Sequence, residues 1–243
     1  MPSRTATLST AVRTDGVDPI TEGTGGWADP LDQAFNRQVA GLVRLGYPAL
    51  AGMSPAEFEA LCEPLRAVAH TAGPAPFRPA TRSWMPFVLV VSGELVRAEE
   101  IVPLLTLAGR PDTGTVDRNH GEDGLAPYRP LPELNVPHTG VYLLTDVERG
   151  EEFRGIRPAD ALPPILERGR SPLTIHEGIA VVTHFPEALE KNNCFMLSGS
   201  RRGDRRVPAM WISGRAPKLG WCWEGNPHTW LGTASAAARH TAP

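Results

Sequence analysis

The loop at residues 117–123 concentrates side chains that could do acid–base chemistry. It reads Asp-Arg-Asn-His-Gly-Glu-Asp, so His120 has carboxylates on both sides. A histidine beside a carboxylate can act as a general base, and mixed nitrogen and oxygen donors also suit a divalent metal. We predict His120 as a catalytic base that Glu122 orients. The alternative is a solvated loop in which Gly121 and Gly124 are turn residues.

A second candidate segment, Trp221–Trp230, combines aromatic and titratable side chains. Trp221 and Trp223 would share one face of a strand, because side chains alternate along it. Asn226 and His228 follow directly, and aromatic walls with a few polar groups are typical of ligand pockets. We predict Trp221, Trp223 and Asn226 as ligand-binding and His228 as catalytic. The alternative is a Trp-rich edge of the core, capped by an Asn-Pro turn.

Four arginines surround a Gly-Asp pair at residues 203–204: Arg201, Arg202, Arg205 and Arg206. Guanidinium groups bind phosphate or carboxylate through paired hydrogen bonds. We therefore predict Arg201 and Arg202 as ligand-binding residues. The alternative is a charged hairpin tip that protects the edge of a sheet.

Together these segments favour a small-molecule binding protein, or an enzyme doing acid–base chemistry on an anionic, partly planar substrate. This single-site hypothesis needs His120, Arg202 and His228 within one pocket, roughly 10–15 Å across. The alternative is a non-catalytic protein-interaction module that docks through the Trp-rich strands or the arginine hairpin. The sequence does not decide whether the protein is an enzyme, and it identifies no cofactor, substrate or oligomeric state.

Charge and cysteine content exclude several classes of protein. The net charge of −3 gives no general attraction to nucleic acid or to an anionic membrane, so we expect neither as a partner. The apolar run Phe87–Val91 is far shorter than the ~20 residues of a membrane helix. Three scattered cysteines form no disulfide framework and no zinc motif, so we expect no metal site and a cytoplasmic protein.

Start signals for helices punctuate the first half of the chain. Asp29-Pro30 predicts an N-cap followed by proline in the first turn, and Ser54-Pro-Ala-Glu57 is a capping box. These two helices would form an N-terminal hairpin. Proline-containing helical segments are expected at 97–110 and 157–170, either as copies of a duplicated strand–helix unit or as unrelated helices. A further capping box, Thr174–Glu177, starts another helix.

Strand signals lie in the middle and at the end. The apolar run 87–91 and the run 140–144 suit buried strands. Residues 194–197, 207–213 and 218–223 predict three short strands, the first two joined through Gly203-Asp204. The fold class is therefore α+β, with central mixed strand and helix units and a C-terminal antiparallel meander. We expect a disordered tail at 1–28, one globular domain at 29–233 and a frayed tail at 234–243.

Three stretches together are similar to a known family: Arg170–Gly178, Leu197–Ser213 and Pro217–Gly232. The pattern resembles an uncharacterised family of bacterial proteins common in GC-rich genomes, over residues from about Leu31 to Ala237. Of the 24 basic residues only Lys191 and Lys218 are lysines, and codon bias in a GC-rich genome explains that excess of arginine. The family has no assigned activity, so the resemblance implies no catalytic residue, cofactor or partner.

Overall fold

Local capping signals place the first helix where the sequence predicts it. In the computed structural model, which describes residues 29–243, α1 runs over Pro30–Leu45. The carboxylate of Asp29 accepts a hydrogen bond from the main-chain N–H of Leu31 at 2.8 Å. Gly46 ends the helix in the left-handed conformation, with φ of 89°, as helix C-caps commonly do. The tail expected at 1–28 lies outside the described residues.

Both predicted capping boxes are formed. Ser54 and Glu57 cap α3 (Pro55–Cys62), and Thr174 caps α7 (Ile175–His184) with the help of Glu177. In each box the cap side chain accepts from the third helical N–H, and the glutamate accepts from the main-chain N–H of the cap residue. The start of α7 is therefore fixed by its own sequence.

Proline interrupts two of the other predicted helices, because it lacks an N–H and its ring collides with the preceding turn. The second N-terminal helix stops before Pro64 and restarts as α4 (Leu65–Ala72). The helix expected at 97–110 is only α5 (Ala98–Ile101) followed by the 3-10 turn η1 (Val102–Leu104). The helix expected at 157–170 forms as α6 (Pro158–Glu167). The remaining short helical segments are α2 (Tyr47–Leu50), η2 (Arg118–His120), η3 (Pro132–Leu134), η4 (Glu151–Phe153) and η5 (Pro186–Ala188).

The first sheet has two long buried strands, β1 (Trp84–Val91) and β4 (Val141–Glu148), which pair antiparallel. They extend the runs predicted at 87–91 and 140–144. Its short strands are β5 (Ser171–Pro172), β11 (Ser235–Ala236) and β12 (Ala238–His240), in the order β1-β4-β11-β5 with β12 also on β4.

The C-terminal segment is therefore part of the fold, and the frayed tail expected from Ala234 is wrong over residues 234–240. Ser235 pairs with Glu148, and Ala238 pairs with Thr145 on the same edge of β4. Ala234 and Ala236 are buried. Small residues give little local signal, but here they fit beside a strand that is distant in sequence.

The second sheet contains the predicted meander, in the order β10-β6-β8-β9-β2. Its strands are β2 (Thr115–Val116), β6 (Cys194–Met196), β8 (Arg206–Ser213), β9 (Ala216–Trp223) and β10 (Leu231–Thr233). A two-residue turn with positive φ at Gly214 and Arg215 joins β8 to β9. The hairpin predicted at Gly203-Asp204 is not the direct link between the first two strands, because β7 (Ser200–Arg201) intervenes and pairs with β3 (Arg129–Pro130).

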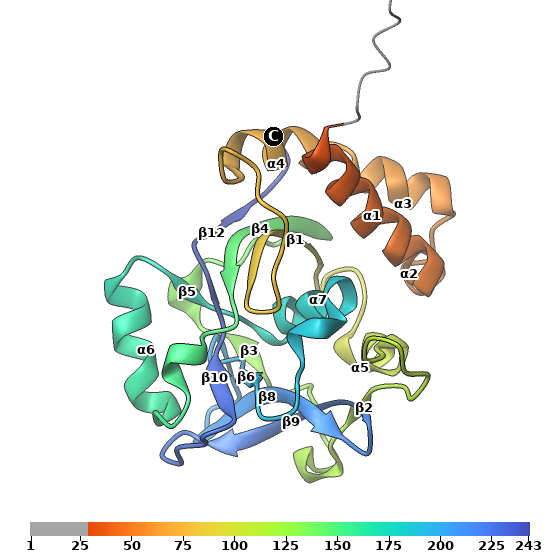
Figure 1. Cartoon of the computed structure of the whole chain (residues 1–243). Coiled ribbons are helices and arrows are strands. Elements are labelled where there is room, and N and C mark those ends of the chain that lie inside the picture. Colours follow the sequence, from red (N-terminus) through yellow and green to blue (C-terminus); the bar gives the residue numbers. More distant parts are fainter. Residues whose placement is uncertain (1–28) are drawn as a thin grey trace, which may run out of the picture.

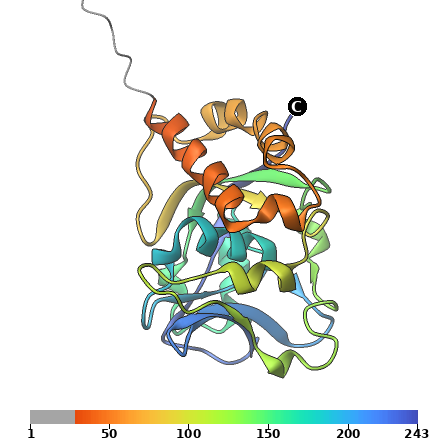
Figure 2. The same ribbon diagram turned by 90° about the vertical axis from the view of Figure 1, so that its right-hand side faces the viewer.

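Helix α7 lies between the two sheets, below β1 and β4 and above β8 and β9 (Figure 1). The same layers are visible from the side in Figure 2, with α1 to α4 covering the outer face of the first sheet. Gly178 allows α7 to approach the second sheet closely, because a Cβ there would lie 2.2 Å from the Leu197 side chain. Within residues 29–243, no helix is long and apolar enough to cross a membrane.

Side chains from two helices form hydrogen bonds with the main-chain groups at the free edge of β1. Gln38 of α1 donates to the carbonyl of Phe87 and accepts from the N–H of Leu89. His184 of α7 hydrogen-bonds through Nε2 to the carbonyl of Leu89 at 2.8 Å. A buried main-chain group without a partner is costly, so these contacts fix α1 and α7 against the sheet.

Candidate functional site

The predicted base His120 is sealed inside the protein. His120 is the last residue of η2 and is 2% exposed, and within residues 29–243 neither ring nitrogen has a hydrogen-bond partner. The ring packs edge-on against Tyr128, with centroids 5.5 Å apart. Burial lowers the pKa of His120, and the guanidinium groups of Arg202 and Arg206 act in the same direction. Glu122 is exposed and makes no hydrogen bond to the ring, so its expected orienting role is wrong.

Some of the predicted ligand-binding residues do meet around this loop. Arg202 donates from Nη1 to the carbonyl of His120 at 3.0 Å, and the indole N–H of Trp221 donates to the carbonyl of Asn119 at 2.9 Å. Arg201 donates from Nη1 to the main-chain carbonyls of Ser198 and Ser200. Arg202 and Trp221 therefore bind the main chain of the His120 loop, and Arg201 binds the main chain of its own segment. All three side chains have a structural role.

The other predicted site residues, Trp223, Asn226 and His228, do not lie together around His120. Trp223 packs edge-on against Trp221 and is 43% exposed, and Asn226 is exposed in the turn that follows. His228 packs instead on Trp230, with ring centroids 5.5 Å apart. In the part of the chain described here, no hydrogen bond or ring contact joins His228 to His120 or Arg202. The three segments therefore meet through Trp221 and Arg202, but the end of the Trp221–Trp230 segment that carries His228 has no contact with His120 or Arg202 among residues 29–243.

A cavity of about 1010 Å³ opens at the start of α7, and we call it the α7 cavity. Tyr128, whose ring packs against His120, contributes to its wall, whereas His120 does not line it. Its other polar lining comes from β3, β4, β7, the start of α7, the segment from the end of β1 into α5, and the loop after η3. These residues are Ser92, Glu94, Arg97, Glu99, Arg129, Asn135, His138, Tyr142, Thr174, His176 and Ser200.

His176 is the residue of this lining that is best suited to accept a proton. Its Nε2 lies 3.2 Å from the carbonyl of Val96, which can only accept, so Nε2 carries the hydrogen. Nδ1 is then an acceptor, and it makes no hydrogen bond within residues 29–243. Burial lowers the pKa of His176, which keeps the ring neutral at physiological pH. Gly93 lies against the ring, because a Cβ there would lie 2.9 Å from Cε1.

A buried ion pair fixes the wall of the α7 cavity. Glu177 is fully buried, and Arg239 of β12 donates to both of its oxygens, from Nε at 2.6 Å and from Nη2 at 2.9 Å. The same carboxylate accepts from the hydroxyl of Tyr142 at 2.9 Å and from the N–H of Thr174 at 2.7 Å. Two lining residues are therefore held by one charged group. Ser200 is also fixed, since its Oγ accepts from the N–H of Ile175.

The sequence analysis missed this site, although one of its signals was visible. The Thr174–Glu177 capping box marked the start of α7, and His176 lies inside it. The pairing of Glu177 with Arg239 had no local signal, because 62 residues separate them. Tyr142 was assigned only to a buried strand. The two histidines of α7, His176 and His184, bond to different carbonyls, so they do not form a joint metal site.

The fold and cavity define an α+β protein with a polar pocket at a capped helix start, between two sheets. Residues 41–242 match the model of a family described as a family of unknown function (DUF5701). That match covers most of the 243 residues, so the chain belongs to this family, as the resemblance implied. No curated protein matches the chain, and no solved structure matches it.

Proposed function

We propose that this protein binds a small polar molecule in the α7 cavity, where His176 accepts a proton from it. The observation that supports the proposal most strongly is the Nε2 hydrogen bond to Val96, which leaves Nδ1 as a free acceptor on a ring lining the cavity. A volume of about 1010 Å³ is at the upper end of the size of small-molecule pockets. The proposal keeps the acid–base chemistry expected from the sequence and moves it from His120 to His176.

Arg129 gives the α7 cavity one place for an anionic group, in a lining that also contains Arg97, Glu94 and Glu99. Arg129 is exposed at the cavity, donates from Nη1 only to the carbonyls of Ala126 and Tyr128, and has no carboxylate partner in residues 29–243. The start of α7 also lines the cavity, and the dipole of a helix favours negative charge at its N-terminus, although the N–H groups of Ile175 and Glu177 are already bonded to Ser200 and Thr174. An anion held between Arg129 and the start of α7 would lie beside the proton acceptor His176.

The fixed lining supports chemistry as well as binding. A general base contributes most when its ring and the groups around it are already in place, because little is then lost in ordering them. Tyr142 and Thr174 are held by Glu177, and His176 is held by Val96 and Gly93. A neutral histidine of lowered pKa accepts protons at neutral pH, and loses that capacity as the pH falls through its pKa.

A thermal-shift screen of organic anions tests the proposal, using wild type and two variants. Gly93→Ala places a methyl group against the His176 ring and should reduce the shift given by any compound bound there. His184→Gln is the matched control, because His184 is on the same helix and does not line the cavity. A compound at 100 times its Kd should add about 2.7 kcal/mol to stability. The proposal would be contradicted if no compound raised the melting temperature, or if each compound raised it equally in wild type and Gly93→Ala.

A second candidate function is protein interaction through the face formed by Trp221 and Trp223. Trp223 is the most exposed of the large apolar side chains in the described chain, and Arg206 stacks 4.7 Å from the centre of the Trp221 ring. Large aromatic and arginine side chains are enriched at interfaces. A Trp223→Ser variant that loses self-association in sedimentation velocity, where wild type associates, would support this second function. Identical sedimentation of the two would count against self-docking.

We also propose that the protein works in the reducing cytoplasm. Its cysteines, Cys62, Cys194 and Cys222, are all buried free thiols. Burial raises the pKa of Cys62 and of Cys222 to about 12. Thiols of that kind are inert packing groups. Oxidant treatment followed by mass spectrometry should find all three reduced in the folded protein.

A further inference from the structure

A second cavity, of about 880 Å³, lies on the second sheet, and we call it the Trp cavity. Trp211 of β8 and Trp230 before β10 line it, with ring centroids 6.0 Å apart and planes at 82°. Neither the proposed function nor the family assigns it any role.

The two indoles are held by packing on both sides. Trp211 lies across the main chain of Gly220 on β9, because a Cβ at Gly220 would lie 2.0 Å from the ring. Trp230 is backed by the ring of His228 at 5.5 Å. The aromatic surface is therefore already formed by neighbouring side chains that pack in the order Gly220, Trp211, Trp230 and His228. Binding a flat ring there needs no reordering of the walls.

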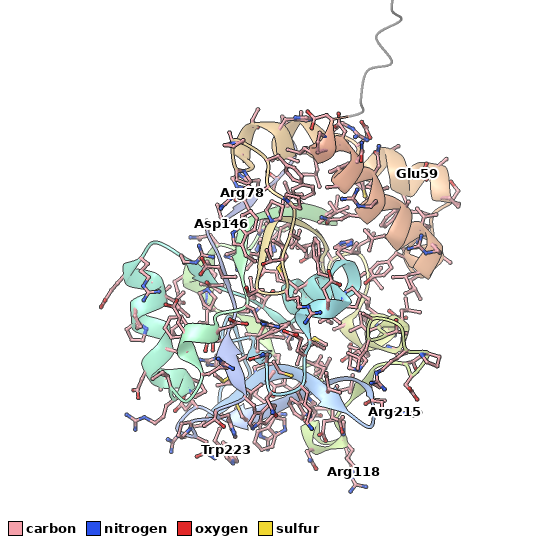
Figure 3. The ribbon with its side chains drawn as sticks, viewed as in Figure 1. Glu59, Arg78, Arg118, Asp146, Arg215 and Trp223 are labelled. Atoms are coloured by element: carbon pink, nitrogen blue, oxygen red, sulfur yellow. The ribbon has the colours of Figure 1, made fainter. Side chains whose placement is uncertain are left out.

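Cations converge on the Trp cavity from separate loops. Arg110 and Lys191 line it, and neither makes an ion pair within residues 29–243. Arg215 lines it from the β8–β9 turn, at the far end of the hairpin from Trp223 (Figure 3), and its partner Asp112 is 3.5 Å away.

Acidic groups in the lining do not cancel this charge. Glu190 is already shared between Arg82 and the buried Arg149. Glu187 is the other acidic lining residue. Arg110, Lys191 and Arg215 thus leave a net positive rim in a protein whose overall charge is −3.

We propose that the Trp cavity binds a flat organic anion, an aromatic ring that carries a phosphate or carboxylate group. The ring would stack offset on one indole and meet the other edge-on, because the two planes are nearly perpendicular and both geometries gain energy beyond burial. The anionic group would lie on Arg110 and Lys191, since hydrogen bonds to ionised groups are the stronger ones. This site is independent of the α7 cavity, and neither proposal needs the other.

Quenching of tryptophan fluorescence by naphthyl phosphate tests the proposal, with naphthol and inorganic phosphate as half-ligands. We expect saturable binding of naphthyl phosphate and much weaker binding of each half-ligand. The double variant Arg110→Gln/Lys191→Gln should weaken binding at least about tenfold, which corresponds to roughly 1.4 kcal/mol. The double variant Arg37→Gln/Arg44→Gln, at two exposed positions of α1, is the charge-matched control and should bind as wild type does.

Four results would overturn the proposal. The first is no saturable quenching by naphthyl phosphate. The second is equal affinity of wild type and the double variant. Both substituted side chains are exposed, so weaker binding by the double variant would not be a result of misfolding. The third is loss of binding in Gly93→Ala, because that would put the ligand in the α7 cavity. Equal affinity for inorganic phosphate would refute the role of the indoles, which a Trp230→Leu variant checks separately.

Discussion

The α7 cavity and the Trp cavity differ in what holds their lining residues in place. In the α7 cavity the carboxylate of Glu177, paired with Arg239, fixes Tyr142 and Thr174 through hydrogen bonds. In the Trp cavity, rings pack on rings and on Gly220, and the cations at the rim are exposed. Hydrogen bonds are directional, whereas ring packing tolerates different ligands. The first cavity is therefore suited to placing a proton, and the second to holding a flat ligand.

The largest expected effect is the loss of Arg239. The Arg239→Ala variant leaves the fully buried Glu177 carboxylate without its counter-charge, which typically costs 3–5 kcal/mol. The exposed pair Arg215–Asp112 at the Trp cavity should contribute about 0–1 kcal/mol. Urea denaturation of Arg239→Ala and Asp112→Ala measures both. Similar losses in the two variants would refute the distinction between the cavities.

The next effect is a pH dependence of stability that arises from His184. Burial lowers the pKa of His184 to about 4 from an ordinary value of 6.5. The unfolded chain therefore binds the proton first, and the stability that His184 contributes falls as the pH falls from 6.5 to 4. Over that window the loss should reach about 3 kcal/mol. The His184→Gln variant keeps a donor for Leu89 and should lack this component, so the two urea-denaturation curves against pH should converge at low pH.

A smaller effect is expected from Gly220 in the Trp cavity. The Gly220→Ala variant puts a methyl group into the Trp211 ring, and overpacking of this kind costs typically 1–3 kcal/mol. Gly41→Ala is the control: it lies inside α1 with nothing nearer than Arg44 at 3.9 Å, and should stabilise by roughly 0.5–1 kcal/mol. Thermal unfolding of both variants shows whether each substitution raises or lowers the stability of the protein. A Gly220→Ala variant as stable as wild type would mean that Trp211 is not fixed on β9.

Features of the fold with local causes could be predicted from the sequence. The starts at Asp29, Ser54 and Thr174 were right, because an N-cap bonds to a group two or three residues away. The buried strands β1 and β4 were also right, because their apolar runs are continuous. Segment 234–240 was misjudged, since its strand pairing with β4 depends on residues about ninety positions away.

The candidate site could not be predicted from the sequence for the same reason: its contacts join residues that are far apart along the chain. The His120 loop has the right residue types, but Tyr128 closes over the ring and Arg202 uses its charge on a main-chain carbonyl. His176 was not among the predicted site residues, since its free Nδ1 and its fixed ring depend on Val96 and Gly93, which are about eighty positions away. Residue type shows which chemistry a side chain can do, and burial and partners decide whether it can do it.

Nitrogen NMR of ¹⁵N-histidine-labelled protein, titrated from neutral to acidic pH, tests the central claim most directly. The His176→Gln variant assigns the resonances. We predict that His176 carries its hydrogen on Nε2, that Nδ1 is unprotonated at neutral pH, and that the ring titrates below 6.5. A His176 ring protonated on Nδ1, or one that titrates at or above 6.5, would show that it is not the free acceptor on which the proposed function depends.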